Sequence, residues 1–339
     1  MLKNRTILIT GGTGSFGRKF TKMIFDKCGP RKVIIFSRDE FKQYEMSKAF
    51  PVEKYPIRYF LGDIRDKDRL FRAFEGVDYV VHAAALKQVP ALEYNPTEAV
   101  KTNVVGADNI VDAALDAGVK KVVALSTDKA VSPVNLYGAT KLVAEKIFVA
   151  ANAYGGERTK FSVVRYGNVV GSRGSVVPLF VDFKNKGIKR FPITDERMTR
   201  FWMTLEQSAD LVIKALEESV GGEVFVPRIP SMKITDLARA VDPECSFEII
   251  GIRPGEKLHE ALISGDEAPN VRIFDGVYII LPQFFEKGTE IYAKYYDKER
   301  VPEDFIYRSD RNEDWISDKE AQKIIFPRKK SGVTVLSGE

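Results

Sequence analysis

The stretch TILITGGTGSFG, residues 6–17, decides the fold of this chain. Five residues with the apolar character of a buried strand lead directly into a turn rich in glycine. Gly12, Gly14 and Gly17 fit the pattern GxGxxG, whose missing side chains allow a tight turn, a pyrophosphate near the backbone and a helix packed close to the strand. A plain tight turn is the alternative, but a strand before the glycines and a helix after them favour a dinucleotide-binding loop.

Similar apolar runs recur along the first half of the chain, separated by longer mixed stretches. They are KVIIFS (32–37), IRYFLGD (57–63), YVVHAAA (79–85), KVVALST (121–127) and FSVVRYGN (161–168). The stretches between them carry helical apolar spacing, and strands that alternate with helices indicate right-handed βαβ units. We therefore predict an α/β fold, a doubly wound parallel sheet of the Rossmann type with a smaller mixed α/β substrate-binding cap.

The division of the chain follows from a change of rhythm after about residue 166, where glycine and proline become frequent in GNVVGSRGSVVP. A helix pattern in TLEQSADLVIKALEES and a strand pattern in EVFVPR come next. We expect a cofactor-binding Rossmann domain over 1–165 with 200–228 returning to it, a substrate-binding domain over 166–199 and 229–330, and a frayed tail over 331–339.

Composition excludes several classes of protein. Among 339 residues, 52 Lys and Arg against 47 Asp and Glu leave a formal net charge of +5, which is too mild to indicate a nucleic-acid partner. The sequence has no apolar run of membrane-spanning length and MLKNRTILIT lacks the pattern of a signal peptide, so we expect a cytoplasmic protein without a membrane partner. With two cysteines and two histidines, His82 and His259, both interpreted as structural, we expect no metal site.

The end of the second predicted strand, FSRDE, indicates which dinucleotide binds. An NAD enzyme of this fold places an acid there for the ribose 2′-OH, whereas this chain has Ser37 and Arg38, with Lys42 nearby, which suit a 2′-phosphate. Asp39 and Glu40 weaken this inference, and a solvated surface charge is the alternative interpretation of Arg38. The pattern therefore favours NADP over NAD.

A second pattern, STDKAVSPVNLYGATK at 126–141, follows the fifth predicted strand. Tyr137 and Lys141 are four residues apart, which puts both side chains on one face of a helix. The same spacing at Tyr44 and Lys48 does not follow a strand end with polar residues and serves as an internal control. Ligands bind beyond the carboxyl ends of parallel strands, so the residues at 127–129 should project into the binding crevice.

The chemistry of this second pattern is that of alcohol oxidation. A lysine ammonium and a cationic nicotinamide ring both favour the phenolate of Tyr137 and lower its pKa from about 10. The phenolate can then take a proton from a hydroxyl as hydride leaves the carbon. We expect Thr127 to hold the same oxygen and Lys141 to reach the nicotinamide ribose.

These residues resemble the extended branch of the short-chain dehydrogenase/reductase superfamily, which acts on nucleotide sugars, and most of the chain takes part. Within it the chain is most similar to the inverting UDP-N-acetylglucosamine 4,6-dehydratase group of pseudaminic acid and related deoxy-aminosugar biosynthesis. The resemblance is carried by GGTGSFG, SRDEFKQYEM, GDIRD, AAALKQVP, NVVGADNI, STDKA, NLYGATK, VRYGNVVGSRGSVVP, TDERMTRFWM and RPGEKLHE.

The resemblance implies dehydration of UDP-N-acetylglucosamine with a tightly bound and recycled NADP. After oxidation at C4, Lys129 would remove the C5 proton and Asp128 would protonate the departing O6 hydroxyl, before hydride returns to C6 and C5 is inverted. The product would be UDP-2-acetamido-2,6-dideoxy-β-L-arabino-hexos-4-ulose. The group also implies a homo-oligomer, either a dimer or dimers assembled into a hexamer.

The resemblance further implies which residues bind. Those expected at the cofactor are Gly11, Thr13, Gly14, Ser15, Phe16, Gly17, Ser37, Arg38, Lys42, Asp63, Ile64, Ala83, Ala84, Ala85, Asn103, Tyr137 and Lys141. Those expected at the substrate are Lys87, Asn168, Ser172, Arg173, Val176, Arg200, Arg253 and Glu256. The structural alternatives are a solvated loop lysine for Lys87, turn capping for Asp63 and Asn168, and pairing of Arg200 with Asp195 or Glu196.

Lys129 can act as a base only under an energetic condition. Near neutral pH its pKa must fall from about 10.4 by roughly 3 units, on the order of 4 to 5 kcal/mol. The alternative is a turn lysine paired with a carboxylate. Asp128 must conversely hold a proton when it acts as an acid.

Two other functions remain open at this point. A nucleotide-sugar 4-epimerase also needs Thr127, Tyr137 and Lys141, but it has no use for Asp128 and Lys129. A non-catalytic NADP-sensing module keeps the glycine loop and can dispense with the tyrosine and the lysine.

Overall fold

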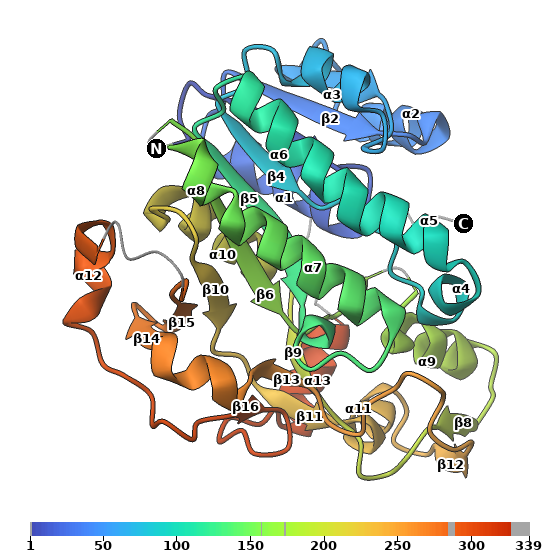
Figure 1. Ribbon diagram of the computed structural model, residues 1–339. Coiled ribbons are helices and arrows are strands. Elements are labelled where there is room, and N and C mark those ends of the chain that lie inside the picture. Colours follow the sequence, from blue (N-terminus) through green and yellow to red (C-terminus); the bar gives the residue numbers. More distant parts are fainter. Residues whose placement is uncertain (1, 157, 173, 284–288, 327–339) are drawn as a thin grey trace.

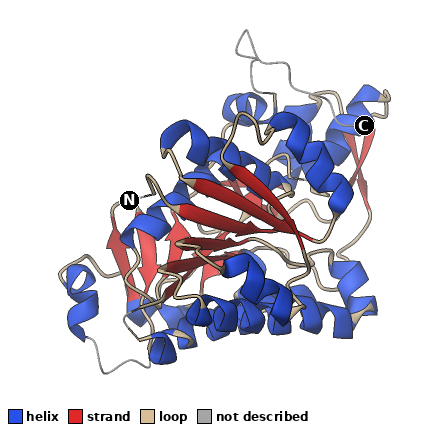
Figure 2. Cartoon of the chain, turned by 90° about the horizontal axis from the view of Figure 1, so that it is seen from above, coloured by secondary structure: helices blue, strands red, loops and turns tan. Residues whose placement is uncertain are grey.

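The computed structural model describes residues 2–156, 158–172, 174–283 and 289–326. It has two parts, a large sheet with helices on both faces and a smaller part built from short strands and helices (Figures 1 and 2). Arg173 and the predicted tail 331–339 lie outside the described residues.

Nine strands form the large sheet in the order β14-β15-β10-β6-β5-β4-β1-β2-β3. Their bounds are β1 Thr6–Thr10, β2 Lys32–Ser37, β3 Ile57–Leu61, β4 Tyr79–His82, β5 Lys121–Thr127, β6 Lys160–Tyr166, β10 Val224–Pro227, β14 Val271–Phe274 and β15 Val277–Ile280. Neighbouring strands from β3 to β10 pair in parallel. All residues of β1 are buried, as a central strand covered on both faces requires. The predicted doubly wound parallel sheet is confirmed.

Helices cover both faces of this sheet. On one face α1 contacts α10, and on the other α6 contacts both α3 and α7 (Figure 1). The helices of this part are α1 Ser15–Lys27, α2 Glu40–Ala49, α3 Lys67–Phe74, α4 Val89–Tyr94, α5 Pro96–Ala99, α6 Gly106–Asp116, α7 Leu136–Ala150, α8 Asn152–Gly155, α10 Leu205–Glu218 and α12 Ala293–Tyr296. Among the described helices, none is both long and apolar enough to cross a membrane.

The smaller part has its own apolar core, in which Phe180, Phe191 and Trp202 are buried. It contains a three-stranded sheet in the order β11-β9-β7 and the strand pairs β12-β8 and β13-β16. Its elements are β7 Asn168–Val169, α9 Val176–Asn185, β8 Arg190–Ile193, β9 Thr199–Met203, β11 Ser231–Lys233, α11 Ile234–Val241, β12 Ser246–Ile249, β13 Ala261–Ile263, β16 Tyr307–Arg308 and α13 Asp318–Ile325. The mixed α/β composition predicted for this part is therefore present.

Two segments lie elsewhere than the predicted division places them. Residues 271–280, expected in the substrate-binding part, form the antiparallel hairpin of β14 and β15 beside β10 in the large sheet. Asp275 and Gly276 form its turn with φ of 47° and 77°, and an Asp-Gly pair is the sequence signal for such a hairpin. Residues 200–203, expected in the large domain, belong to β9, which pairs with β7 and β11 in the smaller part.

Candidate active site

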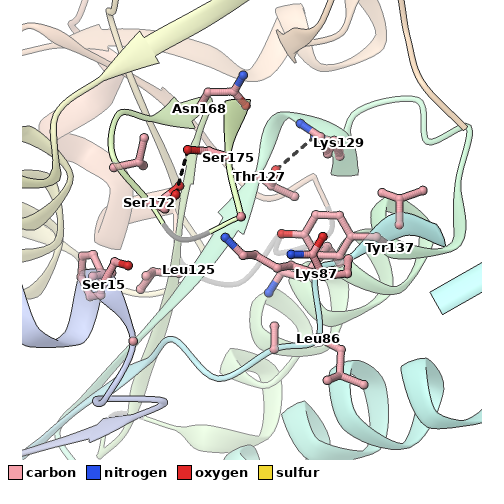
Figure 3. Close-up of a pocket in the computed structure, with 18 of the residues that line it drawn as sticks. Ser15, Leu86, Lys87, Leu125, Thr127, Lys129, Tyr137, Asn168, Ser172 and Ser175 are labelled. Atoms are coloured by element: carbon pink, nitrogen blue, oxygen red, sulfur yellow. Dashed lines mark hydrogen bonds between the residues drawn. The ribbon is translucent and has the colours of Figure 1, made fainter. Parts of the chain in front are cut away.

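A cavity of about 1050 Å³ lies where the loops after the parallel strands meet the smaller part. The predicted binding residues that line it are Gly11, Thr13, Gly14, Ser15, Phe16, Gly17, Ser37, Arg38, Lys42, Asp63, Ile64, Ala83, Ala84, Ala85, Lys87, Tyr137, Lys141, Asn168, Ser172, Val176, Arg200, Arg253 and Glu256. Thr127 and Lys129 line the same cavity (Figure 3). Among the predicted site residues that the structure describes, Asn103 and Asp128 do not line the cavity.

The glycine loop joins β1 to α1 and leaves the start of this helix open. Gly14 occupies the capping position without a side chain, and the first turn of α1 has no acidic residue. A Cβ on Gly17 would lie 2.3 Å from the carbonyl oxygen of Gly12, so glycine is needed for α1 to pack this close to the loop. A helix start of this kind, with its first N–H groups exposed to a cavity, suits a phosphate.

Hydroxyls and cations line the cavity near the end of β2. The Thr13 and Ser37 hydroxyl oxygens lie 3.1 Å apart. Asp39 caps α2, because its carboxylate accepts from the backbone N–H of Lys42 over 2.9 Å and pairs with the Lys42 ammonium at 2.7 Å. These contacts with Lys42 lower the pKa of Asp39. Asp39, one of the two acids that weakened the inference for NADP, is therefore engaged at the start of α2.

Arg38 and Asp63 meet at the adjoining edge of the cavity, with Arg38 Nη1 3.6 Å from Asp63 Oδ2. Asp63 also caps a turn, because it accepts from the backbone N–H of Arg65 over 3.0 Å. Burial acts to raise the pKa of Asp63, but the hydrogen bonds and charge of Arg65 outweigh it and the pKa is lowered. Asp63 therefore caps a turn and also lines the cavity.

Asn103 requires a correction to the predicted cofactor-binding set. Its side chain is buried, accepts from Leu86 N over 2.9 Å, and donates to Leu86 O over 2.9 Å and to Thr140 Oγ1 over 3.1 Å. A buried amide is stable only when its donors and acceptor are satisfied, and these partners satisfy them. Asn103 therefore braces the loop after β4 against α7 and does not face the cavity.

The start of α7 presents Tyr137 and Lys141 to the cavity. Asn135 caps this helix with its side chain. The internal control behaves differently, since Tyr44 is 59% exposed and Lys48 pairs with its neighbour Glu45 at 2.6 Å. Only the second Tyr and Lys pair predicted from the sequence belongs to the cavity.

Burial dominates the pKa of Tyr137 in the protein alone, whereas the predicted lowering rests on a cationic nicotinamide ring as well as a lysine. Burial raises the pKa of Tyr137, while the charge of Lys129 and a hydrogen bond with Thr127 oppose the rise and Asp128 adds to it. Burial also lowers the pKa of Lys141 to about 8, against the opposing charge of Glu145. The phenol is therefore neutral here, because burial outweighs the cation beside it.

Asp128 and Lys129 form an ion pair in the short helical turn η2 (Asp128–Ala130) after β5. Lys129 Nζ lies 3.0 Å from Asp128 Oδ1, which also accepts from the Thr127 hydroxyl over 2.9 Å. Asp128 is fully buried, and its Oδ2 has no hydrogen-bond partner among the described residues. As a correction, Asp128 does not line the cavity itself but contacts two residues that do.

Glu260 is a second carboxylate at Lys129, and sequence reasoning missed it. Its Oε1 lies 3.4 Å from Lys129 Nζ, and its side chain is 3% exposed. Burial acts to lower the pKa of Lys129, but the charges of Asp128 and Glu260 outweigh it and raise that pKa above its ordinary value. The lowered pKa that Lys129 would need as a base is therefore not present in the protein alone. Lys129 is instead paired with carboxylates, which was the alternative interpretation.

Arg200 contacts other partners than Asp195 or Glu196, which were considered from the sequence. Its guanidinium donates to the backbone carbonyls of residues 199, 257 and 258 over 2.7–3.1 Å, and its Nε lies 3.9 Å from Glu260. Asp195 instead pairs with Arg197 at 2.7 Å. Arg200 lines the cavity, but its main role in the chain is to tie β9 to the segment 257–260.

The predicted substrate-binding residues come from several loops around the cavity. Burial, followed by the charge of Lys129, lowers the pKa of Lys87. Asn168 begins β7, and the Ser175 hydroxyl donates to the carbonyl of Ser172 over 2.8 Å in the turn before α9 (Figure 3). Further along the chain, the backbone N–H of Arg253 donates to Glu256 Oε2 over 3.3 Å. These loops bring cations and polar groups to the end of the cavity formed by the smaller part.

Both histidines have structural partners. The Thr10 hydroxyl lies 2.8 Å from His82 Nδ1, and burial lowers the pKa of His82 to about 3. The Thr199 hydroxyl lies 2.8 Å from His259 Nδ1, a partner that the sequence did not indicate. Within the described ranges, no group of three or more His, Cys, Asp and Glu side chains is arranged to hold a metal ion.

Comparison with known proteins assigns the family. A family model described as polysaccharide biosynthesis protein matches residues 7–282. The UDP-N-acetylglucosamine 4,6-dehydratase (inverting) of Campylobacter jejuni subsp. jejuni serotype O:2 is 53% identical over 330 residues, which cover 96% of this chain and 98% of that protein. A Rickettsia massiliae protein named UDP-glucose 4-epimerase is 45% identical, with 79% of this chain and 80% of that protein covered.

Solved structures agree with this assignment. The X-ray structure of Pen from Bacillus thuringiensis has a TM-score of 0.87 and 40% identity, and covers 96% of this chain and 98% of that chain. DesIV, a dTDP-glucose 4,6-dehydratase from Streptomyces venezuelae solved with NAD and TYD bound, shares the fold with a TM-score of 0.69 at 22% identity, covering 85% of this chain and 97% of that chain. The chain therefore belongs to the polysaccharide biosynthesis protein family and, as its motifs indicated, to the extended short-chain dehydrogenase/reductases.

Proposed function

We propose that the chain is an NADP-dependent UDP-N-acetylglucosamine 4,6-dehydratase that inverts C5 and yields UDP-2-acetamido-2,6-dideoxy-β-L-arabino-hexos-4-ulose. The observation that carries the proposal is the pair of Asp128 and Lys129 beside Tyr137 and Lys141. Reversible oxidation at C4 needs only Thr127, Tyr137 and Lys141, whereas loss of water across C5 and C6 needs an acid and a base in addition. The identity of 53% to the Campylobacter jejuni dehydratase supports the same substrate.

The residues of the cavity fit a nicotinamide dinucleotide. The uncapped start of α1 offers N–H groups to a pyrophosphate, and the small side chains at 83–85 leave room along the wall. Ser37, Arg38 and Lys42 would hold a 2′-phosphate, which supports NADP over NAD. When bound, the cofactor supplies a reversible acceptor for the hydride of C4.

Tyr137 is the proposed proton acceptor for the C4 hydroxyl. Its hydrogen bond with Thr127 would place both oxygens against the same substrate hydroxyl. Because burial keeps the phenol neutral, deprotonation requires positive charge nearby, which Lys129 contributes and which Lys141 would add with substrate and cofactor bound. Lys141 would also donate a hydrogen bond to the nicotinamide ribose.

The ion pair at Lys129 already contains the proton that dehydration needs. Transfer of that proton from Lys129 Nζ to Asp128 Oδ1 across 3.0 Å gives a neutral amine and a carboxylic acid without exchange with solvent. The amine can then take the C5 proton, whose bonding electrons form the C5–C6 double bond, while the acid protonates the O6 hydroxyl that leaves as water. Both groups return to the charged pair. The raised pKa of Lys129 in the resting protein is therefore compatible with its role as a base.

Arg253 and Glu256 are proposed to bind the nucleotide end of the substrate. The planar guanidinium of Arg253 offers paired donors to a diphosphate, and the carboxylate of Glu256 accepts from ribose hydroxyls. Lys87, whose pKa is lowered, would orient the sugar near Lys129. We further propose that the protein is cytoplasmic and forms a homo-oligomer, either a dimer or a hexamer. Light scattering after size-exclusion chromatography would measure the number of subunits.

A nucleotide-sugar 4-epimerase is the second candidate, since the Rickettsia massiliae relative at 45% identity is named UDP-glucose 4-epimerase. The two functions differ in their need for Lys129. For the dehydratase, Lys129→Ala should reduce product formation by about 10²- to 10⁴-fold, the usual contribution of a general acid or base. Full turnover of the sugar nucleotide by Lys129→Ala would favour the epimerase.

Variants of Tyr137 and of the control Tyr44 distinguish both enzymes from an NADP-sensing module. Tyr137→Phe should bind cofactor but abolish turnover, and Tyr44→Phe, the control on the exposed α2, should behave as the wild type. A wild-type protein that binds NADP and converts no nucleotide sugar would support the sensing module instead.

A further inference from the structure

Three ionisable side chains follow one another at intervals of four residues on α7. Tyr137, Lys141 and Glu145 therefore share one face of the helix, each one turn beyond the last. Lys141 is 4% exposed and Glu145 is 3% exposed. Burial of a carboxylate is costly unless it is paired, and an apolar side chain would serve the helix equally well. The position of Glu145 therefore indicates a role beyond packing.

Glu145 is held in place from two strands of the large sheet. The hydroxyl of Ser126, which directly precedes Thr127 in β5, donates to Glu145 Oε1. Arg165 in β6 donates from Nε to Oε1 over 3.2 Å and from Nη2 to Oε2 over 2.6 Å. Arg165 is fixed in turn by Glu267, to which it donates over 2.9 and 3.0 Å. The carboxylate cannot rotate away without breaking this network.

Among the charged groups near Lys141, Glu145 is the carboxylate whose charge acts to raise the pKa of this lysine. His82 in β4 has a pKa lowered to about 3, first by burial and then by the charge of Lys141, so its imidazole is neutral at physiological pH. On η2, Asp128 is engaged by Lys129 at 3.0 Å. On α7 itself, Tyr137 is a neutral phenol in this state.

Arg165 in β6 carries a positive charge beside Glu145, and its donors are directed at Glu145 and Glu267. Burial lowers the pKa of Lys141 to about 8, and the charge of Glu145 opposes this lowering. Without that charge, the amine of Lys141 would lose its proton at a lower pH still.

We propose that Glu145 is a positioning residue that keeps Lys141 in its ammonium form from the adjacent turn of α7. The inference deepens the proposed function and rests on it, because the ammonium is the form that stabilises the Tyr137 phenolate and donates fully to the ribose. A nearby opposite charge shifts a pKa by about 1 to 3 units, and Arg165 screens part of the Glu145 charge, so we expect a shift of about one unit.

The first measurement reads Lys141 directly and needs no activity. Full-length protein labelled with carbon-13 at lysine Cε is titrated by NMR, and the Lys141 resonance is assigned with Lys141→Arg. In the wild type this resonance should titrate near pH 8. In Glu145→Gln it should titrate about one unit lower.

The second measurement is the pH profile of dehydration by the cofactor-loaded protein. The alkaline limb of kcat/KM should move to lower pH in Glu145→Gln, with about tenfold less activity than the wild type beyond both midpoints. Glu267→Gln is the matched control, since it removes the other carboxylate from Arg165 but does not lie on the helix face of Lys141. Its alkaline limb should stay where the wild-type limb lies.

An unchanged Lys141 titration in Glu145→Gln, or an equal shift in Glu267→Gln, would overturn the proposal. If Glu145→Gln does not fold, the triple variant Glu145→Gln/Arg165→Met/Glu267→Gln leaves no charge of the buried cluster without a partner and should still show a lowered Lys141 titration. Wild-type protein that fails to dehydrate the sugar would refute the proposed function instead, and the NMR titration would still decide the role of Glu145.

Discussion

Replacing Arg165 by methionine should lower the free energy of unfolding by about 3–5 kcal/mol. Arg165 is 2% exposed and donates five hydrogen bonds of 2.6–3.2 Å, to both oxygens of Glu145, both oxygens of Glu267 and the carbonyl of Leu262. Methionine fills similar space without charge or donors. Two carboxylates then lose their cation, and an uncompensated buried charge costs more than an ordinary lost hydrogen bond.

Urea denaturation followed by far-ultraviolet circular dichroism at neutral pH measures this loss. The triple variant Glu145→Gln/Arg165→Met/Glu267→Gln should recover most of it, because a neutral cluster leaves no charge without a partner. An Arg165→Met protein within about 1 kcal/mol of the wild type would refute the reasoning, since exposed ion pairs are worth no more than that. A triple variant no more stable than Arg165→Met would refute it as well.

Three further predictions concern other parts of the site. Gly138→Ala would put a Cβ 2.1 Å from the carbonyl oxygen of Lys129. The turn that carries Lys129 must then move, so dehydration should fall by about 10²-fold while cofactor affinity by fluorescence titration is kept. Arg38→Ala should raise the Kd for NADP by about 10- to 100-fold and change that for NAD little, as calorimetry can show. For Glu267, burial acts to raise the pKa, but Arg165 outweighs it and the pKa lies below 4.5, so its stabilisation is present above pH 4.5 and lost as the pH falls through the lowered value. The deficit of Glu267→Gln in urea denaturation should therefore shrink on acidification.

The cavity could be predicted from the sequence because its residues follow strand ends in recognisable local patterns. The glycine loop follows β1, Ser37 ends β2, and Thr127 ends β5, and parallel strands bring these ends to one edge of the sheet. The four-residue spacing of Tyr137 and Lys141 was ambiguous alone, and its position after β5 distinguished it from the exposed pair on α2.

The buried ion pairs could not be predicted in the same way. Glu260 meets Lys129, and Arg165 meets Glu145 and Glu267, across segments that are distant in sequence and have no shared periodicity. Those pairings also raise the pKa of Lys129, whereas a base requires a lower one, because its value depends on which carboxylates the fold brings to it. The side chain of Asn103, predicted at the cofactor, instead binds the backbone of the loop after β4, a contact that no local pattern indicates.

The most direct test of the account is incubation of the purified, cofactor-loaded protein with UDP-N-acetylglucosamine, with mass spectrometry and NMR of the product. We expect a product lighter by one water, with the L-arabino configuration at C5 and no net change in the near-ultraviolet absorbance of the cofactor. Recovery of unchanged UDP-N-acetylglucosamine, or of a C4 epimer of the same mass, would contradict it.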